Sequence, residues 1–147
     1  MRSTAISHGT VAIAAAAISA LATMAATQGI GPALAQTSAP TGTLELLRQP
    51  LADLPGREMR ITLLDRAPGN ASPMHRHPGH HTFGYVIQGT YELGVGGAAP
   101  RILHAGDTFY EPPGVLHSVS RNASTTEQLK ILVCQVADAK NPSTVTE

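Results

Sequence analysis

The chain has 147 residues, of which 42% are hydrophobic and only 14% are charged, so it can bury one core of its own. Its ten Lys and Arg residues balance its ten Asp and Glu residues, and no basic run with interleaved aromatic residues is present, so nucleic acid is not an expected partner. The single cysteine, Cys134, excludes an intramolecular disulfide, so the fold has to rely on packing.

The first 35 residues have the parts of a secretory signal peptide in the expected order. Arg2 makes the start of the chain positive, and the stretch 11–26 is apolar and rich in Ala. Ala33 and Ala35 are small residues at the two positions that a signal peptidase recognises before its cleavage site. A retained membrane anchor is the alternative, but the run is short and no stop-transfer charges follow it. We predict cleavage after Ala35 and a mature domain over residues 36–147 that is periplasmic or secreted and not held in the membrane.

The mature chain begins with a segment, residues 36 to about 43, that is rich in Ser, Thr, Pro and Gly and is expected to be loose. In the mature chain only Thr43 to Leu47 is suited to a helical turn. Short apolar runs separated by Gly and Pro then follow one another along the chain. These runs are residues 59–64, 83–87, 91–95, 102–103, 108–110 and 129–136. Runs of this length between turn residues are typical of strands in an all-β barrel or sandwich, and no second domain is indicated.

Histidines gather in the block that precedes the second of these runs. Four of the seven histidines in the chain, His75, His77, His80 and His81, fall within seven residues. Two histidines at positions i and i+2 of a strand point to one face, which suits two imidazole ligands about 2 Å from one divalent ion. A second block ends in His117 after a Pro-Gly turn, and such a turn can bring His117 back across a barrel.

The two blocks resemble the two motifs of the cupin superfamily, and the resemblance covers about residues 58–136. The positions that fit the motifs are Gly69, His75, His77 and Gly89 in the first block and Gly106, Pro112, Gly114 and His117 in the second. The resemblance implies an all-β, double-stranded β-helix (jelly-roll) barrel with one cupin domain. It also implies one divalent metal ion (Fe, Mn, Zn, Ni or Cu) held by His75, His77 and His117, and a homodimer.

One position departs from the family pattern, because Thr82 occupies the place of the Glu in the first motif. A Thr hydroxyl is neutral and is a poor metal ligand. Three interpretations follow: a three-His site completed by water, a site that takes His81 or His80 as a further ligand, or a barrel without metal. A neutral three-His site would leave the ion its full double charge, which favours an anionic or oxygen-donor ligand.

Other side chains in the two blocks have weaker signals. His80 and His81 follow a Pro-Gly pair and are expected at the surface unless one of them is a ligand. Tyr110 and Glu111 precede the Pro-Pro turn and are candidate acid/base or substrate-orienting groups. Gly84 is expected to share a face with Thr82 and so to leave room for a substrate beside the ion.

Two classes of function remain open at this point. In the first, the chain is a metalloenzyme, either an iron-type dioxygenase or an isomerase or lyase, that acts on a small molecule. In the second, it is a non-catalytic barrel that binds a metal or a small anion. A fold alone does not choose between them.

Overall fold

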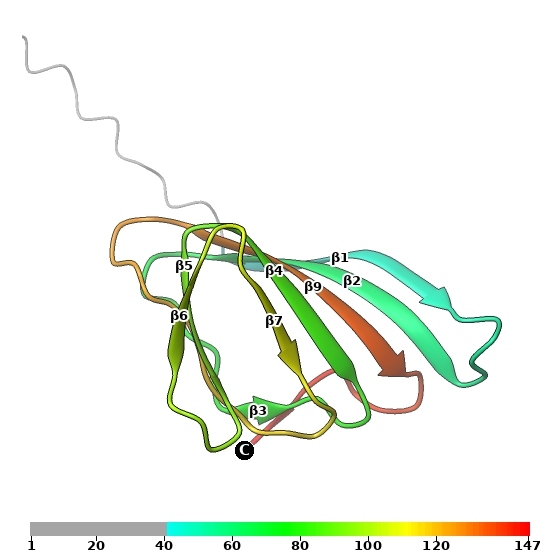
Figure 1. The fold of residues 1–147 in the computed structure, drawn as a ribbon. Coiled ribbons are helices and arrows are strands. Elements are labelled where there is room, and N and C mark those ends of the chain that lie inside the picture. Colours follow the sequence, from blue (N-terminus) through cyan, green and yellow to red (C-terminus); the bar gives the residue numbers. More distant parts are fainter. Residues whose placement is uncertain (1–40) are drawn as a thin grey trace, which may run out of the picture. The chain divides into compact units, whose positions relative to one another are not determined.

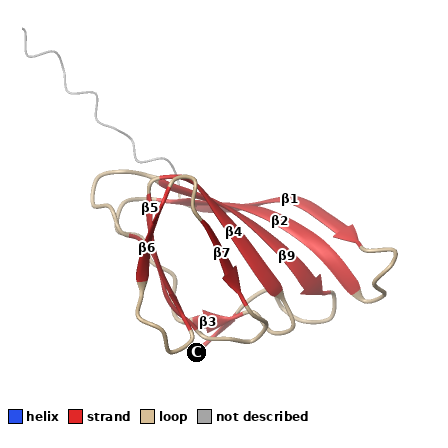
Figure 2. Cartoon of the chain, viewed as in Figure 1, coloured by secondary structure: helices blue, strands red, loops and turns tan. Residues whose placement is uncertain are grey.

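The computed structural model describes residues 41–147, and every regular element in that range is a strand (Figure 2). None of these elements is a helix of membrane-spanning length and hydropathy. The strands are β1 (Gly42–Pro50), β2 (Arg57–Arg66), β3 (His75–Arg76), β4 (His81–Gln88), β5 (Thr90–Val95), β6 (Arg101–His104), β7 (Thr108–Glu111), β8 (His117–Asn122), β9 (Leu129–Asp138) and β10 (Val145–Thr146). The predicted signal peptide and its cleavage site lie outside the described residues.

The strands form two antiparallel sheets of five strands each, and together these make a single-domain jelly-roll barrel as predicted (Figure 1). The first sheet has the order β1-β2-β9-β4-β7 and the second has the order β10-β3-β8-β5-β6. Consecutive strands in the chain often lie in different sheets, which is the arrangement that closes a jelly roll.

Alternation along the strands separates the inside of the barrel from the outside. In β4, the side chains of Thr82 and Val86 are buried, whereas Phe83 and Tyr85 are exposed. The turn from β4 to β5 depends on Gly89, which has a φ of 85°. A Cβ atom there would lie 2.5 Å from the carbonyl oxygen of Gln128, so this turn requires glycine.

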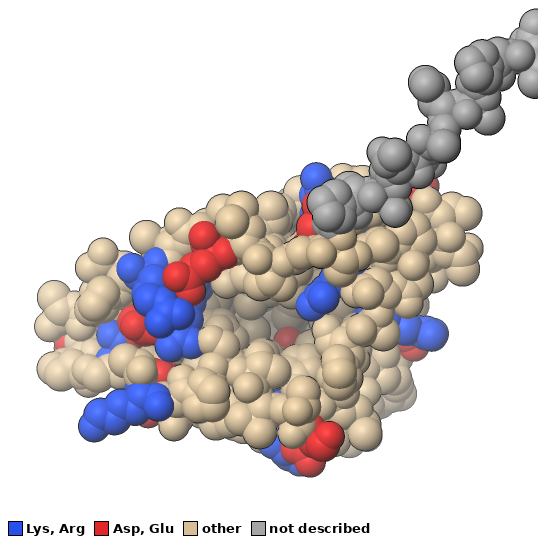
Figure 3. All heavy atoms as spheres, turned by 180° about the vertical axis from the view of Figure 1, so that it is seen from behind, with Lys and Arg blue, Asp and Glu red and all other residues tan. Residues whose placement is uncertain are grey.

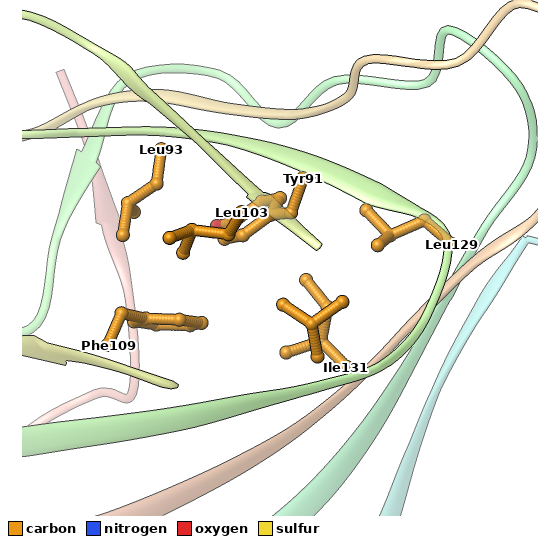
Figure 4. Packing of buried hydrophobic residues seen from close by; sticks show 7 residues of the cluster. Tyr91, Leu93, Leu103, Phe109, Leu129 and Ile131 are labelled. Atoms are coloured by element: carbon orange, nitrogen blue, oxygen red, sulfur yellow. The ribbon is translucent and has the colours of Figure 1, made fainter. Parts of the chain in front are cut away.

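The apolar core fills one end of the barrel between the two sheets (Figure 4). Its members come from both sheets, and they are Val86, Tyr91, Leu93, Leu103, Phe109, Leu129 and Ile131. Phe109 packs against Tyr91 with ring centroids 5.5 Å apart. Because each large side chain buried here contributes about 1.5 to 3 kcal/mol, this end of the barrel supplies most of the hydrophobic stabilisation.

Three strands, β1, β8 and β10, had no counterpart in the sequence prediction, and the helical turn proposed for Thr43 to Leu47 was wrong. That segment belongs to β1, which pairs with β2 along its length although all nine of its residues are exposed. Pairing with a neighbouring strand, and not burial, therefore holds β1 in an extended conformation. The strands β8 and β10 are short or polar, so they lack the apolar run that predicts a strand.

The outer face of the first sheet is unusually apolar. Strand pairing aligns side chains in two rows that cross the sheet, and we call these the outer apolar face: Leu47, Ile61, Cys134, Phe83 and Tyr110 in one row, and Leu44, Leu63, Leu132 and Tyr85 in the other. Leu44, Leu47, Phe83, Tyr85 and Tyr110 are all more than 40% exposed. Contiguous exposed apolar surface of this kind marks an interaction site in many proteins.

Candidate metal centre

Strand pairing in the second sheet brings the three predicted histidines together. β3 lies beside β8 with His75 directly opposite His117, and His77 follows immediately after β3. Gly114, with a φ of 71°, makes the turn that returns the chain from β7 to β8, and its N–H donates to the His77 carbonyl oxygen at 3.0 Å. One ligand atom from each histidine lies within 4.8 Å of the others.

Each of the three imidazole rings has one nitrogen held by a neighbour and one that remains for a ligand. Nδ1 of His75 is 2.8 Å from the Pro73 carbonyl oxygen, and Nδ1 of His77 is 2.5 Å from the Ser143 carbonyl oxygen. His117 is held at its other nitrogen, because its Nε2 lies 3.2 Å from the Tyr91 hydroxyl. Outer contacts of this kind fix the orientation of metal-binding imidazoles.

The surroundings of His75 favour its neutral imidazole form. Burial is the main cause that lowers the pKa of His75, and the nearby His117 and His77 lower it further, while the contact with Pro73 opposes the change. Burial also raises the pKa of the Tyr91 phenol, so its hydroxyl stays protonated. Since a metal competes with protons for imidazole nitrogen, a lowered pKa keeps His75 available to an ion near neutral pH.

A buried carboxylate lies beside the histidines. Glu111 is only 2% exposed, and its Oε2 is 3.1 Å from Nδ1 of His117 and 3.6 Å from Nε2 of His77. Within residues 41–147, neither this oxygen nor Nδ1 of His117 has a hydrogen-bond partner. The sequence singled out Glu111 only as a candidate acid/base group, because nothing in the spacing shows which strand lies next to the His-rich block.

Thr82, which stands at the place of the Glu in the first cupin motif, points into the barrel. It is 1% exposed, and its hydroxyl oxygen accepts a hydrogen bond of 3.1 Å from Nε2 of Gln135. Thr82 lies directly opposite Glu111 in the pairing of β4 with β7. The Thr82 hydroxyl therefore belongs to the wall of the site and already has a polar partner.

The structure does not place His81 or His80 with the three histidines. His81 stacks on Tyr110, with its Nδ1 2.9 Å from the Tyr110 hydroxyl, on the side of the sheet opposite the barrel interior. The expected surface position of His80 was wrong, because His80 is completely buried. The turn that carries it packs against the segment after β9, where a Cβ on Gly79 would lie 2.9 Å from the Asn141 side chain.

The prediction that Gly84 leaves room for a substrate was also wrong. Gly84 does face inward with Thr82, but Phe109 opposite it fills the space. A Cβ on Gly84 would lie 2.0 Å from the Phe109 ring, so the missing side chain accommodates an aromatic ring of the core. The prediction failed because it considered one strand and not its neighbour.

A cavity of about 270 Å³ lies against the site. Most side chains along it are polar, and they include His77, His117, Glu111, Thr82, Gln135, Arg60, Arg66 and Ser120. Figure 3 shows a hollow on the face of the molecule drawn there, with basic side chains near its rim. A cavity of this size admits a small molecule only.

The donor set fits a divalent cation. Three imidazoles each have one nitrogen held and one free, and two buried polar atoms close to one another have no hydrogen-bond partner within residues 41–147. Buried polar atoms without partners are rare, and an ion between them would satisfy both. Imidazole nitrogens suit several divalent transition metals, and the donor set does not select among the ions predicted from the sequence.

Comparison with known proteins gives one family model and several relatives. A model described as a cupin domain matches residues 62–134. Germin-like protein 5-1 of Oryza sativa subsp. japonica is 35% identical over 69 residues, which are 44% of this chain and 31% of the relative. Oxalate oxidase 1 of Hordeum vulgare is 31% identical over 91 residues, which are 55% of this chain and 45% of the relative. The chain thus spans less than half the length of these two curated relatives.

A solved structure of recombinant oxalate oxidase in complex with glycolate has a similar fold. It superposes with a TM-score of 0.55 at 27% identity, over 74% of this chain and 57% of the other.

Proposed function

Since this chain belongs to the cupin family, we propose that it is an exported, metal-dependent oxidoreductase that acts on a small carboxylic acid. The observation that carries the proposal is the cluster of the buried His75 and His117 with the partly buried His77 at the wall of a small polar cavity. When bound, a divalent ion supplies Lewis acidity and, if it is redox-active, electron transfer to or from a substrate. The relatives named as oxalate oxidases, one of them in complex with glycolate, support an organic acid as the substrate class.

A basic side chain in the cavity supports the choice of a carboxylate. Arg66 lines the cavity, and its Nη2 donates to the Ser72 hydroxyl at 3.2 Å. Among residues 41–147 it forms no ion pair, whereas the neighbouring Arg60 is paired with Glu58. Arg66 is therefore free to bind a carboxylate, and a guanidinium binds this group through two parallel hydrogen bonds.

The chain's own residues have distinct tasks in this proposal. Arg66 binds and orients the carboxylate, and Ser120 and Gln135 line the same cavity as hydrogen-bonding groups. The Phe109 ring and the core behind it close the inner end of the barrel and exclude water there. Tyr91, held protonated by burial, keeps the His117 ring in place.

Turnover by the metal-loaded protein tests the proposal. The mature chain, purified without a His-tag, is first assayed for bound metals, and its oxygen uptake is then measured with oxalate, glycolate and the uncharged glycolamide. We expect uptake with a carboxylate but not with glycolamide, and we expect Arg66→Gln to raise KM much more than it lowers kcat. Arg121→Gln is the matched control, since Arg121 pairs with Glu92 and does not line the cavity.

Other results would point to the alternatives. Binding of a carboxylate to the metal-loaded protein without any turnover would indicate the non-catalytic barrel. Conversion of substrate without oxygen uptake would indicate an isomerase or lyase.

Export rests on the first 35 residues. N-terminal sequencing of the protein from a bacterial host is expected to give Gln36 as the first residue, in a periplasmic or medium fraction. A retained Met1 in cytoplasmic protein would contradict export.

We also propose that the protein is a homodimer joined through the outer apolar face. All nine residues of β1, at the margin of that sheet, are exposed, so no other part of residues 41–147 covers this strand. The charged side chains on this side of the sheet stand at strand ends and have both signs, as in the pair of Lys130 with Asp65. Such a face is complementary to a second copy of itself, and it is not complementary to a partner whose surface carries charges of a single sign.

Light scattering after gel filtration tests the dimer. The unmodified chain is expected to have twice the mass of the monomer, and Tyr85→Lys is expected to give a folded monomer. Ile102→Lys is the control, because Ile102 is similarly exposed but lies on β6 in the other sheet. A monomeric unmodified chain would contradict the proposal.

A further inference from the structure

We propose that Glu111 is the carboxylate ligand of the metal, supplied from β7 in place of the Glu that cupins have at the position of Thr82. The proposal rests on metal binding at the three histidines, and it changes the predicted three-His site into one with three nitrogen ligands and one oxygen ligand. No motif position identifies Glu111, because it lies outside the first motif and precedes the Pro-x-Gly of the second.

A carboxyl group as buried as that of Glu111 can be ionised only beside a positive partner. An ionised carboxylate removed from water costs several kcal/mol unless it is paired, and Glu111 is 2% exposed. No Lys or Arg among residues 41–147 forms an ion pair with it; the only groups within 4 Å that can carry positive charge are the rings of His77 and His117. A divalent ion held by those rings would give the carboxylate the charge that it needs.

The orientation of Oε2 supports a shared ion over a simple hydrogen bond. Oε2 faces Nδ1 of His117 at 3.1 Å and Nε2 of His77 at 3.6 Å, yet neither contact is a hydrogen bond. Nε2 of His77 is the nitrogen left free by Ser143, and Nδ1 of His117 is the one left free by Tyr91. The carboxylate oxygen therefore faces two of the three nitrogens that are available to a metal, those of His77 and His117, whereas the free nitrogen of His75 lies farther from it.

Strand register explains why β7 can supply the carboxylate that other cupins supply from the strand corresponding to β4. Thr82 and Glu111 are directly opposite one another in the β4–β7 pair, and both are buried inside the barrel. Cβ atoms of such partners are about 4.5 to 5.5 Å apart, which is within the reach of a Glu side chain. A carboxylate on either strand can thus serve one ion, and Thr82 bonds to Gln135 instead.

A carboxylate ligand would change the net charge of the metal centre. With Glu111 as a ligand, the ion and its protein ligands carry a net charge of one and not two. Anions are then attracted less strongly to the metal than a neutral three-His site would allow. This gives the separate cation Arg66 a larger part in holding a carboxylate substrate.

Cobalt(II) is a suitable probe, because it is bound by the same ligands and absorbs visible light. Affinity is measured by competition with a chelator for the apo forms of the unmodified chain, Glu111→Gln, and the exchange variant Thr82→Glu with Glu111→Thr. Infrared difference spectra with and without cobalt report whether a carboxylate becomes a ligand. Glu92→Gln is the matched control, since Glu92 is a strand residue paired with Arg121.

We expect Glu111→Gln to weaken cobalt binding at least about 100-fold, because the loss of an outer contact alone weakens metal sites 10- to 100-fold. The metal-dependent carboxylate bands are expected in the unmodified chain and in Glu92→Gln, absent in Glu111→Gln, and present again in the exchange variant. Thermal unfolding of the apo forms checks that Glu111→Gln, which keeps the shape of the side chain, is folded.

Three results would overturn the assignment. Metal binding by the unmodified chain without carboxylate bands, or with an affinity that Glu111→Gln leaves unchanged, would show that Glu111 only neighbours His117. If the unmodified chain binds no cobalt while folded, the proposed function fails and this assignment fails with it.

Discussion

The two ends of the barrel are made by the same strands and have opposite chemistry. At one end, the inward row across the first sheet contains Val86, Ile131 and Leu64. Four residues along each strand, the inward row contains Thr82, Gln135 and Arg60, followed by Glu111 on β7. The first row is part of the core or packs against it, and the second is the wall of the cavity.

The core end therefore stabilises the fold, and the other end carries the reactive groups. The core end consists of buried apolar side chains from both sheets, so it can hold the strands in register without help from the site. The other end contains buried polar atoms that have no hydrogen-bond partner among residues 41–147, which lowers stability until a ligand satisfies them. The stability of the core end thus compensates for the site, whose buried polar side chains oppose folding.

The largest expected effect tests the core end. We expect Ile131→Ala to lower the free energy of unfolding by about 2 to 5 kcal/mol, since Ile131 is 1% exposed and its loss leaves a cavity. Urea unfolding of the apo protein measures this change. The metal dissociation constant of the folded variant is expected to stay the same, and a loss of metal binding comparable to that in His75→Ala would contradict the separation of the two ends.

The next effect tests the site end by adding and removing metal. Free metal at 100 times its dissociation constant is expected to raise the free energy of unfolding by about 2.7 kcal/mol, and a chelator is expected to reverse the gain. Unfolding in urea at fixed free metal measures it. His75→Ala, His77→Ala and His117→Ala are each expected to lose the gain, whereas His104→Ala is expected to keep it, because His104 is exposed on β6. An undiminished gain in His117→Ala would place the metal elsewhere.

Features that depend on a single strand could be predicted from the sequence, whereas contacts between two strands could not. Alternating or apolar runs in β4 and β9 gave the strands and the barrel, and the spacing of His75 and His77 placed both rings at one site, although β3 ends at Arg76. The position of Glu111 opposite Thr82 and the packing of Phe109 on Gly84 are consequences of register between β4 and β7. No local pattern encodes that register, so neither could be predicted.

A smaller effect is expected where the two ends meet, at Tyr91. Its ring belongs to the core, and its hydroxyl contacts both Nε2 of His117 and the Ser120 hydroxyl, the latter at 2.9 Å. Tyr91→Phe keeps the ring and removes only the hydroxyl, so metal affinity is expected to fall about 10- to 100-fold, equivalent to about 1.4 to 2.7 kcal/mol. Isothermal titration of the apo variant with metal measures the change. An unchanged affinity would show that His117 is oriented by packing alone.

The smallest effect is expected at His81, whose position separates the inside of the sheet from the outside. His81 lies next to the buried Thr82 in sequence, yet its ring stacks on Tyr110 with centroids 6.1 Å apart, outside the barrel. His81→Ala is therefore expected to leave metal content and affinity unchanged, as measured by elemental analysis and chelator competition beside His75→Ala. If His81→Ala lost metal while His75→Ala kept it, β4 would have to be shifted by one residue, because such a shift turns every side chain to the opposite face. That shift would also move Thr82 out of the barrel and place Phe83 in it, so one variant tests the register on which the whole site depends.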